Sequence, residues 1–501
     1  PARDGAADSA TSTCTPGVSG FRCEGDVAVA CNPDGTDGPR TDCVTLGQVC
    51  AAEIGCAVCR PNAFSCQGND VVRCNPDGTG TIPHATCDPA TGQMCNSVVG
   101  ACTSPCDDAA ASNSYIGCEY FPVTTLNSEV APDFTPAVVI SNPQTAPANV
   151  TITGPGGFNQ TRSIPAGAVD TVELPWVDAL KGTYAEEASV LVPGGAYHVV
   201  STLPVTVYQF NPLEYRIARD CAGESPLDPG FGDGECFSYS NDASLLLPTH
   251  VMTGNYIAMS WPSMLNEITQ DGIFGPETST IGSPGFITIV GVSPTPANVT
   301  VTYNGRVTSG SGVTGGGPGS TGTFTLNQGD VVQLVGELPT SCSPGFTDSV
   351  AGADIDYCTV SADYDLTGTE IVATGGRIEV ISGHNCTFVP YNRWACDHLE
   401  EAMFPLETWG TESIISASQP IRSEPNVIRI MSGAPNNSLT FDPTPPGVSP
   451  RTLNRGEVME FESAVSFRVT GTGPLMITQT LVGQDYAGIG MAGDMGEGDP
   501  A

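Results

Sequence analysis

From residue 107 onward, apolar positions recur every second residue or form short continuous runs, and clusters of Gly, Pro, Asn and Ser separate them. A period of two is typical of a strand with one buried face, whereas a continuous β-branched run fits a strand buried on both faces. The runs lie at 137–140, 150–153, 198–207, 286–292, 299–303, 330–334, 377–381, 427–431 and 466–469. Helical periodicity is nearly absent, and we expect only a short helix near 397–403. The pattern predicts an all-β fold of antiparallel sandwiches.

A sequence repeat divides this β region. The segment 146–153, Ala-Pro-Ala-Asn-Val-Thr-Ile-Thr, returns at 295–302 as Thr-Pro-Ala-Asn-Val-Thr-Val-Thr, and a looser copy begins at 426–431. We therefore predict three tandem β-sandwich-like units, at 107–240, 241–400 and 401–501. The segment 305–322 is rich in Gly, Ser and Thr, and we expect a flexible loop tip there rather than a phosphate-binding loop, because it lacks the Gly-Lys-Ser/Thr ending.

Two small disulfide-rich modules, at 1–58 and 59–106, precede the β units. Six cysteines recur with offsets of 43 to 46 residues, so that Cys14, Cys23, Cys31, Cys43, Cys50 and Cys56 match Cys59, Cys66, Cys74, Cys87, Cys95 and Cys102. Each copy contains Asn-Pro-Asp-Gly, at 32–35 and 75–78, which favours a turn over a calcium loop because the carboxylates lack EF-hand spacing. Six cysteines allow fifteen pairings, so the connectivity within each module stays open.

The cysteines also indicate the compartment. Fourteen of the 20 lie before residue 119, which is typical of an oxidising, extracellular space. Zinc is the alternative at Cys56 and Cys59, but no second ligand pair of matching spacing follows. Outside the modules we expect four further pairs, namely Cys106 with Cys118, Cys221 with Cys236, Cys342 with Cys358, and Cys386 with Cys396.

Composition excludes several partners. The chain has 17 Lys+Arg against 54 Asp+Glu, a formal net charge of −37, and Lys181 is its only lysine. Such a protein repels the phosphate backbone of nucleic acids and anionic membrane surfaces. No run of 18 apolar residues predicts a transmembrane segment. Because the chain begins at Pro1, we expect a processed form that is extracellular or on the outer cell surface.

Candidate chemistry is sparse. His384 and His398, with Asp397 and the Cys386/Cys396 pair, could hold zinc, but we favour a disulfide-closed loop followed by a capped helix. Calcium is the other candidate ion, at a carboxylate loop of Asp354, Asp356, Asp363 and Asp365; we expect no other cofactor. The acidic segment 220–236 resembles this loop in composition. Gly-x-Ser-x-Gly and His-Glu-x-x-His motifs are absent, so we predict that the protein is not an enzyme. Five glycosylation sequons lie at Asn149, Asn159, Asn298, Asn385 and Asn436.

Several motifs resemble one known family. They are Gly-Cys-Glu-Tyr at 117–120, Tyr-Gln-Phe-Asn-Pro at 208–212, Ser-Asn-Asp-Ala-Ser-Leu-Leu-Leu-Pro at 240–248, Asp-Leu-Thr-Gly at 365–368, Gly-His-Asn-Cys at 383–386 and Ala-Cys-Asp-His-Leu-Glu-Glu at 395–401. Over roughly 115–501 the chain resembles the IgGFc-binding protein N-terminal domain, as found in large secreted proteins of predatory and fruiting delta-type bacteria. In that family the β region continues past Gly-Asp-Pro-Ala, here 498–501, so we expect the third unit to be truncated.

The resemblance implies secretion, surface display and an adhesion or matrix role without established enzyme activity; it does not imply antibody binding. We therefore predict a secreted or cell-surface, non-enzymatic adhesion protein that contacts a protein or glycan on a surface. The alternative is a structural subunit that polymerises with itself into a fibre or sheath through exposed strand edges. In either case we expect the acidic residues to lie on solvated loops.

Overall fold

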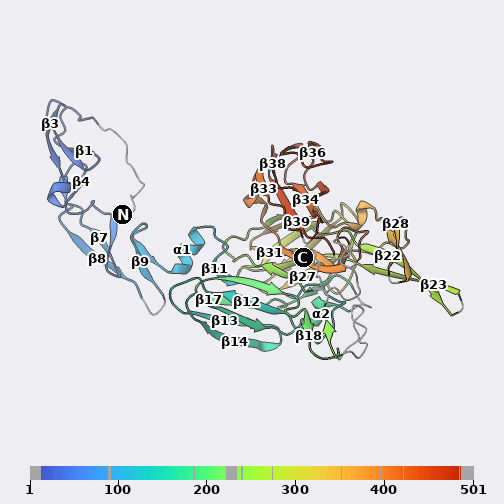
Figure 1. The fold of residues 1–501 in the computed structure, drawn as a ribbon. Coiled ribbons are helices and arrows are strands. Elements are labelled where there is room, and N and C mark those ends of the chain that lie inside the picture. The colour runs from blue at the N-terminus through green and yellow to red at the C-terminus, as the bar shows by residue number, and fades with distance from the viewer. Residues whose placement is uncertain are drawn as a thin grey trace. The chain divides into compact units, whose positions relative to one another are not determined.

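The computed structural model describes residues 13–88, 92–183, 187–221, 234–238, 241–273, 275–350, 352–394, 396–420, 422–483 and 486. It divides into two compact units, 1–112 and 113–501, which are described separately (Figure 1). The strands pair antiparallel. The described helices are short: they are α1 (Pro105–Ala111), α2 (Asp178–Lys181) and 3₁₀ helices of three residues each. The predicted all-β fold is confirmed. No helix of the described residues is long and apolar enough to cross a membrane.

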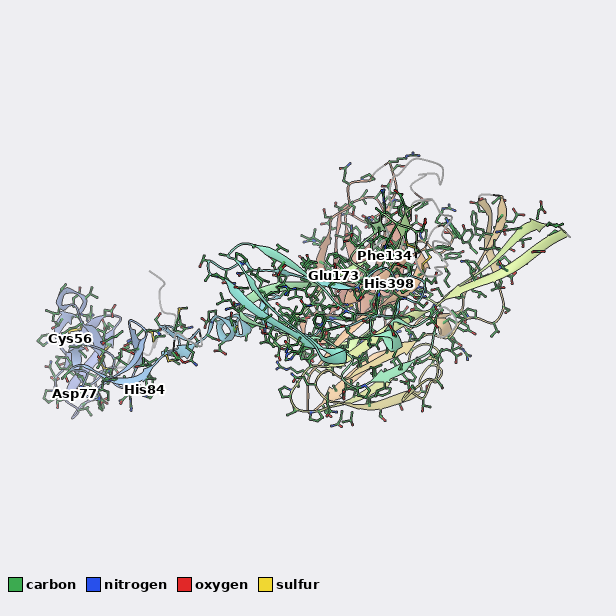
Figure 2. The ribbon with its side chains drawn as sticks, turned by 90° about the horizontal axis from the view of Figure 1, so that it is seen from below. Cys56, Asp77, His84, Phe134, Glu173 and His398 are labelled. Atoms are coloured by element: carbon green, nitrogen blue, oxygen red, sulfur yellow. A yellow bond between two sulfur atoms is a disulfide. The ribbon has the colours of Figure 1, made fainter. Side chains whose placement is uncertain are left out.

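The N-terminal unit contains two copies of one small β module. Each copy has a three-stranded sheet followed by a two-stranded one: β1 (Gly20–Glu24), β2 (Val27–Cys31), β3 (Asp37–Asp42), β4 (Val49–Ala51) and β5 (Gly55–Ala57), then β6 (Phe64–Gln67), β7 (Asp70–Cys74), β8 (Thr81–Thr86), β9 (Met94–Asn96) and β10 (Ala101–Thr103). Figure 2 labels Cys56, Asp77 and His84 in this unit. Helix α1 ends the unit and begins with a capping box between Ser104 and Asp107.

Both copies share one disulfide connectivity, in which cysteines one and three, two and five, and four and six are joined. The bonds are Cys14–Cys31, Cys23–Cys50 and Cys43–Cys56, then Cys59–Cys74, Cys66–Cys95 and Cys87–Cys102. In the Asn-Pro-Asp-Gly turns, Asp34 and Asp77 accept hydrogen bonds from the backbone and hydroxyl of the Thr two residues later. Disulfides replace the apolar core that modules of this size cannot build.

The second unit contains three sandwiches with one strand order. In each, the first strand lies between the fourth and the last strand. The second strand lies beside the third; its other neighbour is the long last strand in the first sandwich and the next-to-last strand in the other two. The first sandwich has β12 (Ala137–Ser141), β13 (Ala148–Gly154), β14 (Phe158–Ile164), β15 (Val169–Glu173) and the long β17 (His198–Phe210). The second has β24 (Gly285–Gly291), β25 (Ala297–Thr302), β26 (Thr321–Leu326), β27 (Val331–Val335), β30 (Glu370–Thr374) and β31 (Ile378–Phe388). The third has β34 (Asn426–Ser432), β35 (Asn437–Asp442), β36 (Arg451–Leu453), β37 (Val458–Ser463), β38 (Phe467–Gly471) and β39 (Leu475–Thr480).

Extra edge strands extend the sheets of the sandwiches. They are β11 (Gly117–Tyr120), β16 (Val190–Val192), β20 (Ala243–Leu245), β21 (Asn255–Ile257), β32 (Cys396–Ala402) and β33 (Glu412–Ile415). Strand β16, from the first predicted unit, pairs with β27, while β20, from the second, pairs with β17. The predicted boundary between residues 400 and 401 lies inside β32. The first and second sandwiches are therefore interlocked by exchanged strands.

One five-stranded sheet, in the order β16-β27-β24-β31-β32, has an apolar core on each face. Val290, Val331 and Ile381 belong to the core of the first sandwich, whereas Ile289 and Val332 belong to that of the second. Every residue of β24, β27 and β31 is buried, which explains the continuous apolar runs in their sequences.

Two local predictions are wrong. Residues 397–403 form no helix, because 396–402 is strand β32, whose backbone pairs with β31. The segment 305–322 is not a free loop tip. Its Val307 and Val313 are buried in the second sandwich's core, and its backbone pairs Val307 with Gly316 and Gly336.

A four-stranded ribbon is added to the second sandwich, in the order β23 (Gly275–Ser283), β22 (Met264–Gly272), β29 (Ala353–Cys358) and β28 (Pro344–Val350). The hairpin β22–β23 extends away from the sandwiches of this unit (Figure 1). Ile273, at its tip, is 96% exposed. The smaller hairpin of β18 (Arg216–Ile217) and β19 (Cys236–Phe237) completes the described strands.

Candidate functional site

The hairpin of β31 and β32 carries the predicted His/Cys/Asp cluster, and it is buried. A β-bulge between His384 and Thr387 separates its two paired stretches, and Cys386 is bonded to Cys396. These two sulfurs and Glu129 are the one group of three potential metal ligands that lies close together in the described residues. Because the disulfide removes both thiolates, this group does not offer the ligands that zinc requires.

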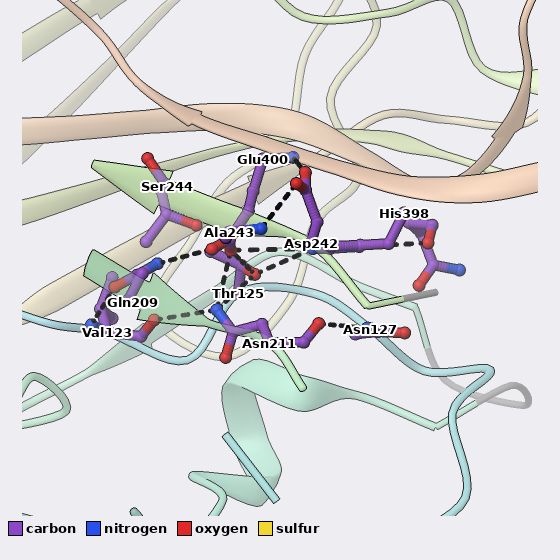
Figure 3. A network of polar contacts seen from close by, with 12 residues as sticks. Val123, Thr125, Asn127, Gln209, Asn211, Asp242, Ala243, Ser244, His398 and Glu400 are labelled. Carbon is purple, nitrogen blue, oxygen red and sulfur yellow. Dashed lines mark hydrogen bonds and ion pairs between the residues drawn. The ribbon is translucent and has the colours of Figure 1, made fainter. Parts of the chain in front are cut away.

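His384 and His398 instead make contacts with other buried residues. The Nδ1 atom of His384 accepts a hydrogen bond from the Cys386 backbone N–H at 3.1 Å. Burial, and then the neighbouring His398, lower the pKa of His384 to about 3, so this ring is neutral. His398 stacks on Phe286. It also contacts Thr125 Oγ1 at 3.3 Å (Figure 3).

Glu400 lies at the centre of a buried polar network (Figure 3). One carboxylate oxygen accepts hydrogen bonds from Thr125 Oγ1 at 2.6 Å and from Asn211 Nδ2 at 2.7 Å. The other accepts from Gln209 Nε2 at 3.1 Å. Glu400 is 3% exposed, so these neutral donors replace the water that its carboxylate would otherwise bind.

The network joins three separate segments of the chain. Gln209 and Asn211 lie at the end of β17, and Glu400 lies on β32. The carboxylate of Asp242, just before β20, accepts the backbone N–H of Glu400 at 2.6 Å, and Ser244 Oγ accepts that of Ala402 at 2.9 Å. These residues are the polar members of the motifs at 208–212, 240–248 and 395–401. The motifs therefore hold the interlocked strands together.

A second buried cluster surrounds Asn385. Its Nδ2 lies 2.9 Å from oxygens of Glu187 and Ser283, and 3.3 Å from Glu129 Oε1. Burial, and then Glu187, raise the pKa of Glu129 to about 8, and burial raises that of Glu187 to about 7. Asn385, also a predicted sequon, is completely buried and cannot carry a glycan in the folded protein. The Asn residues of the other four sequons are exposed.

Sequence analysis missed the buried acids. Glu379 on β31 is 2% exposed, and neither of its carboxyl oxygens has a hydrogen-bond partner among the described residues. Burial, and then Glu400, raise its pKa well above the ordinary value, so it is protonated at neutral pH. The available signal was an acid inside the continuous apolar run 377–381.

A cavity of about 350 Å³ lies beside the Glu400 network. Its lining residues include the apolar Trp261 and Met476 and the acidic Asp242, Glu400 and Glu401. Burial, and then Glu400, raise the pKa of Asp242 well above its ordinary value. No Lys, Arg or His stands among the described residues of this wall. The cavity lining thus contains both apolar and acidic residues.

The predicted calcium ligands lie in different environments. Asp354 and Asp356 lie on β29, where they accept hydrogen bonds from Ser349 and Thr347 across the pair with β28. Asp363 faces Arg306 at 3.6 Å. Asp365 accepts a hydrogen bond from Arg429 Nη2 at 2.9 Å. Among the described residues, no three of these four carboxylates have oxygens within 4.8 Å of one another. Calcium binding at this loop therefore stays a prediction.

The remaining cysteines are bonded as well. Cys221 is joined to Cys236 and Cys342 to Cys358, while Cys106 and Cys118 are both disulfide-bonded. All 20 cysteines lie among the described residues, and none is free. Most of the acidic segment 220–236, at 222–233, lies outside the described residues.

These features define the class of the protein: a disulfide-rich, all-β protein of interlocked sandwiches whose shared polar motifs are internal. The family model described as IgGFc binding protein matches residues 242–501, just over half of the chain, and the chain belongs to this family. The match begins within the predicted motif at 240–248 and covers the second and third sandwiches. No curated protein and no solved structure matches the chain. The disulfides and the family indicate an extracellular binding protein.

Proposed function

We propose that the protein is a non-enzymatic adhesion protein whose ribbon β23-β22-β29-β28 contacts a protein or glycan on a surface. The observation that carries this proposal is the hairpin β22–β23. Six of the nine residues of β23 are exposed, and the tip presents Ile273 to solvent. Ile273 therefore offers apolar surface to a partner at the end of a projecting element. The Cys342–Cys358 bond fixes the ribbon's other end.

Adhesion through the hairpin is tested with Ile273→Asp in the full chain. Ile414→Asp is the matched control, because Ile414 is 78% exposed on β33, in the third sandwich. We expect the unchanged protein and the control to bind components of a glycan array or a panel of immobilised extracellular proteins, and Ile273→Asp to lose that binding. Equal binding by all three proteins, or binding by none, would contradict the proposal.

Self-assembly is the second candidate, because the ribbon ends in two edge strands, β23 and β28, which each pair with one neighbouring strand of the ribbon. Exposed strand edges can add a strand from another chain. Negative-stain microscopy of the secreted material distinguishes the two functions. Regular filaments support the structural role, whereas monomers that bind the array support adhesion.

A further inference from the structure

The hydroxyl group of Thr125 and the carboxyl group of Glu400 are held in contact inside the protein. They lie 275 positions apart in the sequence, yet Thr125 Oγ1 donates a hydrogen bond to Glu400 Oε2 at 2.6 Å. Thr125 belongs to the segment between β11 and β12, whereas Glu400 lies on β32, and both side chains are buried. An alcohol and a carboxyl group are the two reactants of an ester. Fixed contact between two reactants makes their reaction effectively unimolecular.

His398 is placed to move a proton between these two groups. Its Nδ1 lies 3.2 Å from the backbone carbonyl oxygen of Asn385, which can only accept a hydrogen bond. In the neutral ring, Nδ1 therefore carries the proton and Nε2 has a free lone pair. Nε2 lies 3.3 Å from Thr125 Oγ1 and 3.7 Å from Glu400 Oε2. One basic nitrogen thus faces both a hydroxyl that can attack and an oxygen that can leave.

Two amide side chains hold the carboxyl group of Glu400. Gln209 Nε2 donates to Glu400 Oε1 at 3.1 Å, and Gln209 Oε1 accepts the backbone N–H of Val123 at 3.0 Å. Asn211 Nδ2 lies 2.7 Å from Glu400 Oε2 and 3.1 Å from Thr125 Oγ1, so it contacts both reacting groups (Figure 3). A fixed donor at Oε1 stabilises the negative charge that develops on this oxygen when the carboxyl carbon is attacked.

We propose that Thr125 and Glu400 form an intramolecular ester, with His398 as the base. Starting from the protonated carboxyl group, a bond forms between Thr125 Oγ1 and Glu400 Cδ while His398 Nε2 takes the hydroxyl proton. The Cδ–Oε2 bond then breaks, and Oε2 leaves as water with its own proton and the proton that His398 returns. Oε1 remains as the ester carbonyl oxygen, hydrogen-bonded to Gln209. One water is lost, and nothing is oxidised or reduced.

Burial favours the ester over its hydrolysis. Gln209, Asn211 and His398, which surround the reacting pair, are each no more than 2% exposed, so water has little access to Cδ. The ester links the segment before the first sandwich to strand β32 by a covalent bond. The two interlocked sandwiches then stay joined even when their hydrogen bonds are broken. The inference goes beyond adhesion and does not depend on the hairpin β22–β23.

Mass spectrometry of the full chain, denatured and with its disulfides reduced, tests the proposal. The unchanged protein should be about 18 Da lighter than the mass calculated from its sequence, because one water is lost. Thr125→Val, which lacks the hydroxyl, should have its full calculated mass, whereas Thr125→Ser should keep the loss. Thr249→Val is the matched control and should also keep it. The Thr249 hydroxyl donates to the Glu119 carboxylate at 2.8 Å, but His198 contacts that carboxylate from its other oxygen.

A peptide map of the unchanged protein should contain one crosslinked pair of peptides, joined at Thr125 and Glu400, and hydroxylamine should separate them. His398→Gln, checked for folding by circular dichroism, should form much less crosslink. The full calculated mass in the unchanged protein, a loss that persists in Thr125→Val, or a crosslink between other residues would each overturn the proposal. A folded His398→Gln variant that crosslinks as completely as the unchanged protein would overturn the role of the base. If Thr125→Val does not fold, the peptide map decides alone. Ile273→Asp should keep the mass loss, which separates this result from the adhesion experiment.

Discussion

Replacing Arg429 by Met removes a guanidinium group that is 1% exposed and joins the third sandwich to the second. Its Nη2 donates to Asp365 at 2.9 Å, and its Nη1 donates to the backbone oxygen of Ser260 and contacts Thr367 Oγ1 at 3.3 Å. Its plane lies 4.9 Å from the centre of the Trp261 ring. The Asp365 side chain is 15% exposed, so the substitution leaves a largely buried carboxylate without its cation.

Removal of one partner from a buried ion pair costs about 3–5 kcal/mol, and the partial exposure of Asp365 favours the lower end. We therefore expect Arg429→Met to lower the free energy of unfolding by about 3 kcal/mol. The matched control is Arg468→Met, also in the third sandwich. Arg468 and its partner Asp442 are 47% and 76% exposed, and such a surface pair contributes about 0–1 kcal/mol.

Urea denaturation followed by tryptophan fluorescence measures both variants, and Trp261 reports directly on the Arg429 contact. The double variant Arg429→Met/Asp365→Asn should recover part of the loss, because it no longer buries an unpaired charge. If Arg429→Met costs no more than Arg468→Met, or if Asp365→Asn restores nothing, the pair does not hold the two sandwiches together as described.

Three further predictions concern pH, a disulfide and calcium. The pKa of Glu129 is about 8 in the folded protein and about 4.3 when unfolded, so the native state keeps a proton that the unfolded state loses. The melting temperature should therefore fall as pH rises from about 4.3 to about 8, and Glu129→Gln should flatten that slope; an unchanged slope would refute the assignment. Replacing both Cys342 and Cys358 by Ser opens a crosslink of sequence separation 16, which should cost about 3 kcal/mol and speed proteolysis of the ribbon; an unchanged cleavage rate would contradict this. If calcium binds at Asp354, Asp356, Asp363 and Asp365, a chelator should lower the melting temperature of the protein. An unchanged melting temperature would exclude the site.

Half-buried strands were predictable because their signal is local. The segments that begin with Ala-Asn-Val form β13 and β25, whose first five residues alternate between buried and exposed as the sequence does. Their Val side chains enter the cores, and their Asn and Thr side chains face outward. A period of two is enough to specify this placement, because each residue's environment follows from its neighbours in sequence.

The conformation of strand β32 cannot be predicted from its local sequence. Its sequence, Cys-Asp-His-Leu-Glu-Glu-Ala, has a capping residue and good helix formers, so a short helix was the natural prediction. The segment is a strand because His384 pairs with Leu399 and Gly383 with Glu400 in the neighbouring β31. Gly383 allows this close approach, since a Cβ atom there would lie 1.7 Å from the Leu399 carbonyl oxygen. Such non-local pairing decides the conformation against propensity.

The buried acids change how the net charge of −37 relates to the function. We expected the carboxylates on solvated loops, yet Glu129, Glu379 and Glu400 are each less than 9% exposed. The chain has few cations to pair with them, and its only lysine, Lys181, is itself buried and donates to the Val130 carbonyl oxygen at 2.8 Å.

Hydroxyl and amide donors, or protonation, therefore compensate the carboxyl groups of Glu129, Glu379 and Glu400. Gln209, Asn211 and Asp242, the polar residues of the motifs, make these contacts with Glu400. These contacts are internal, so these motif residues hold strands β17, β20 and β32 together. In the adhesion that we propose, recognition depends on exposed residues such as Ile273 at the tip of β22–β23. Two members of the family could therefore share the whole network and bind different partners.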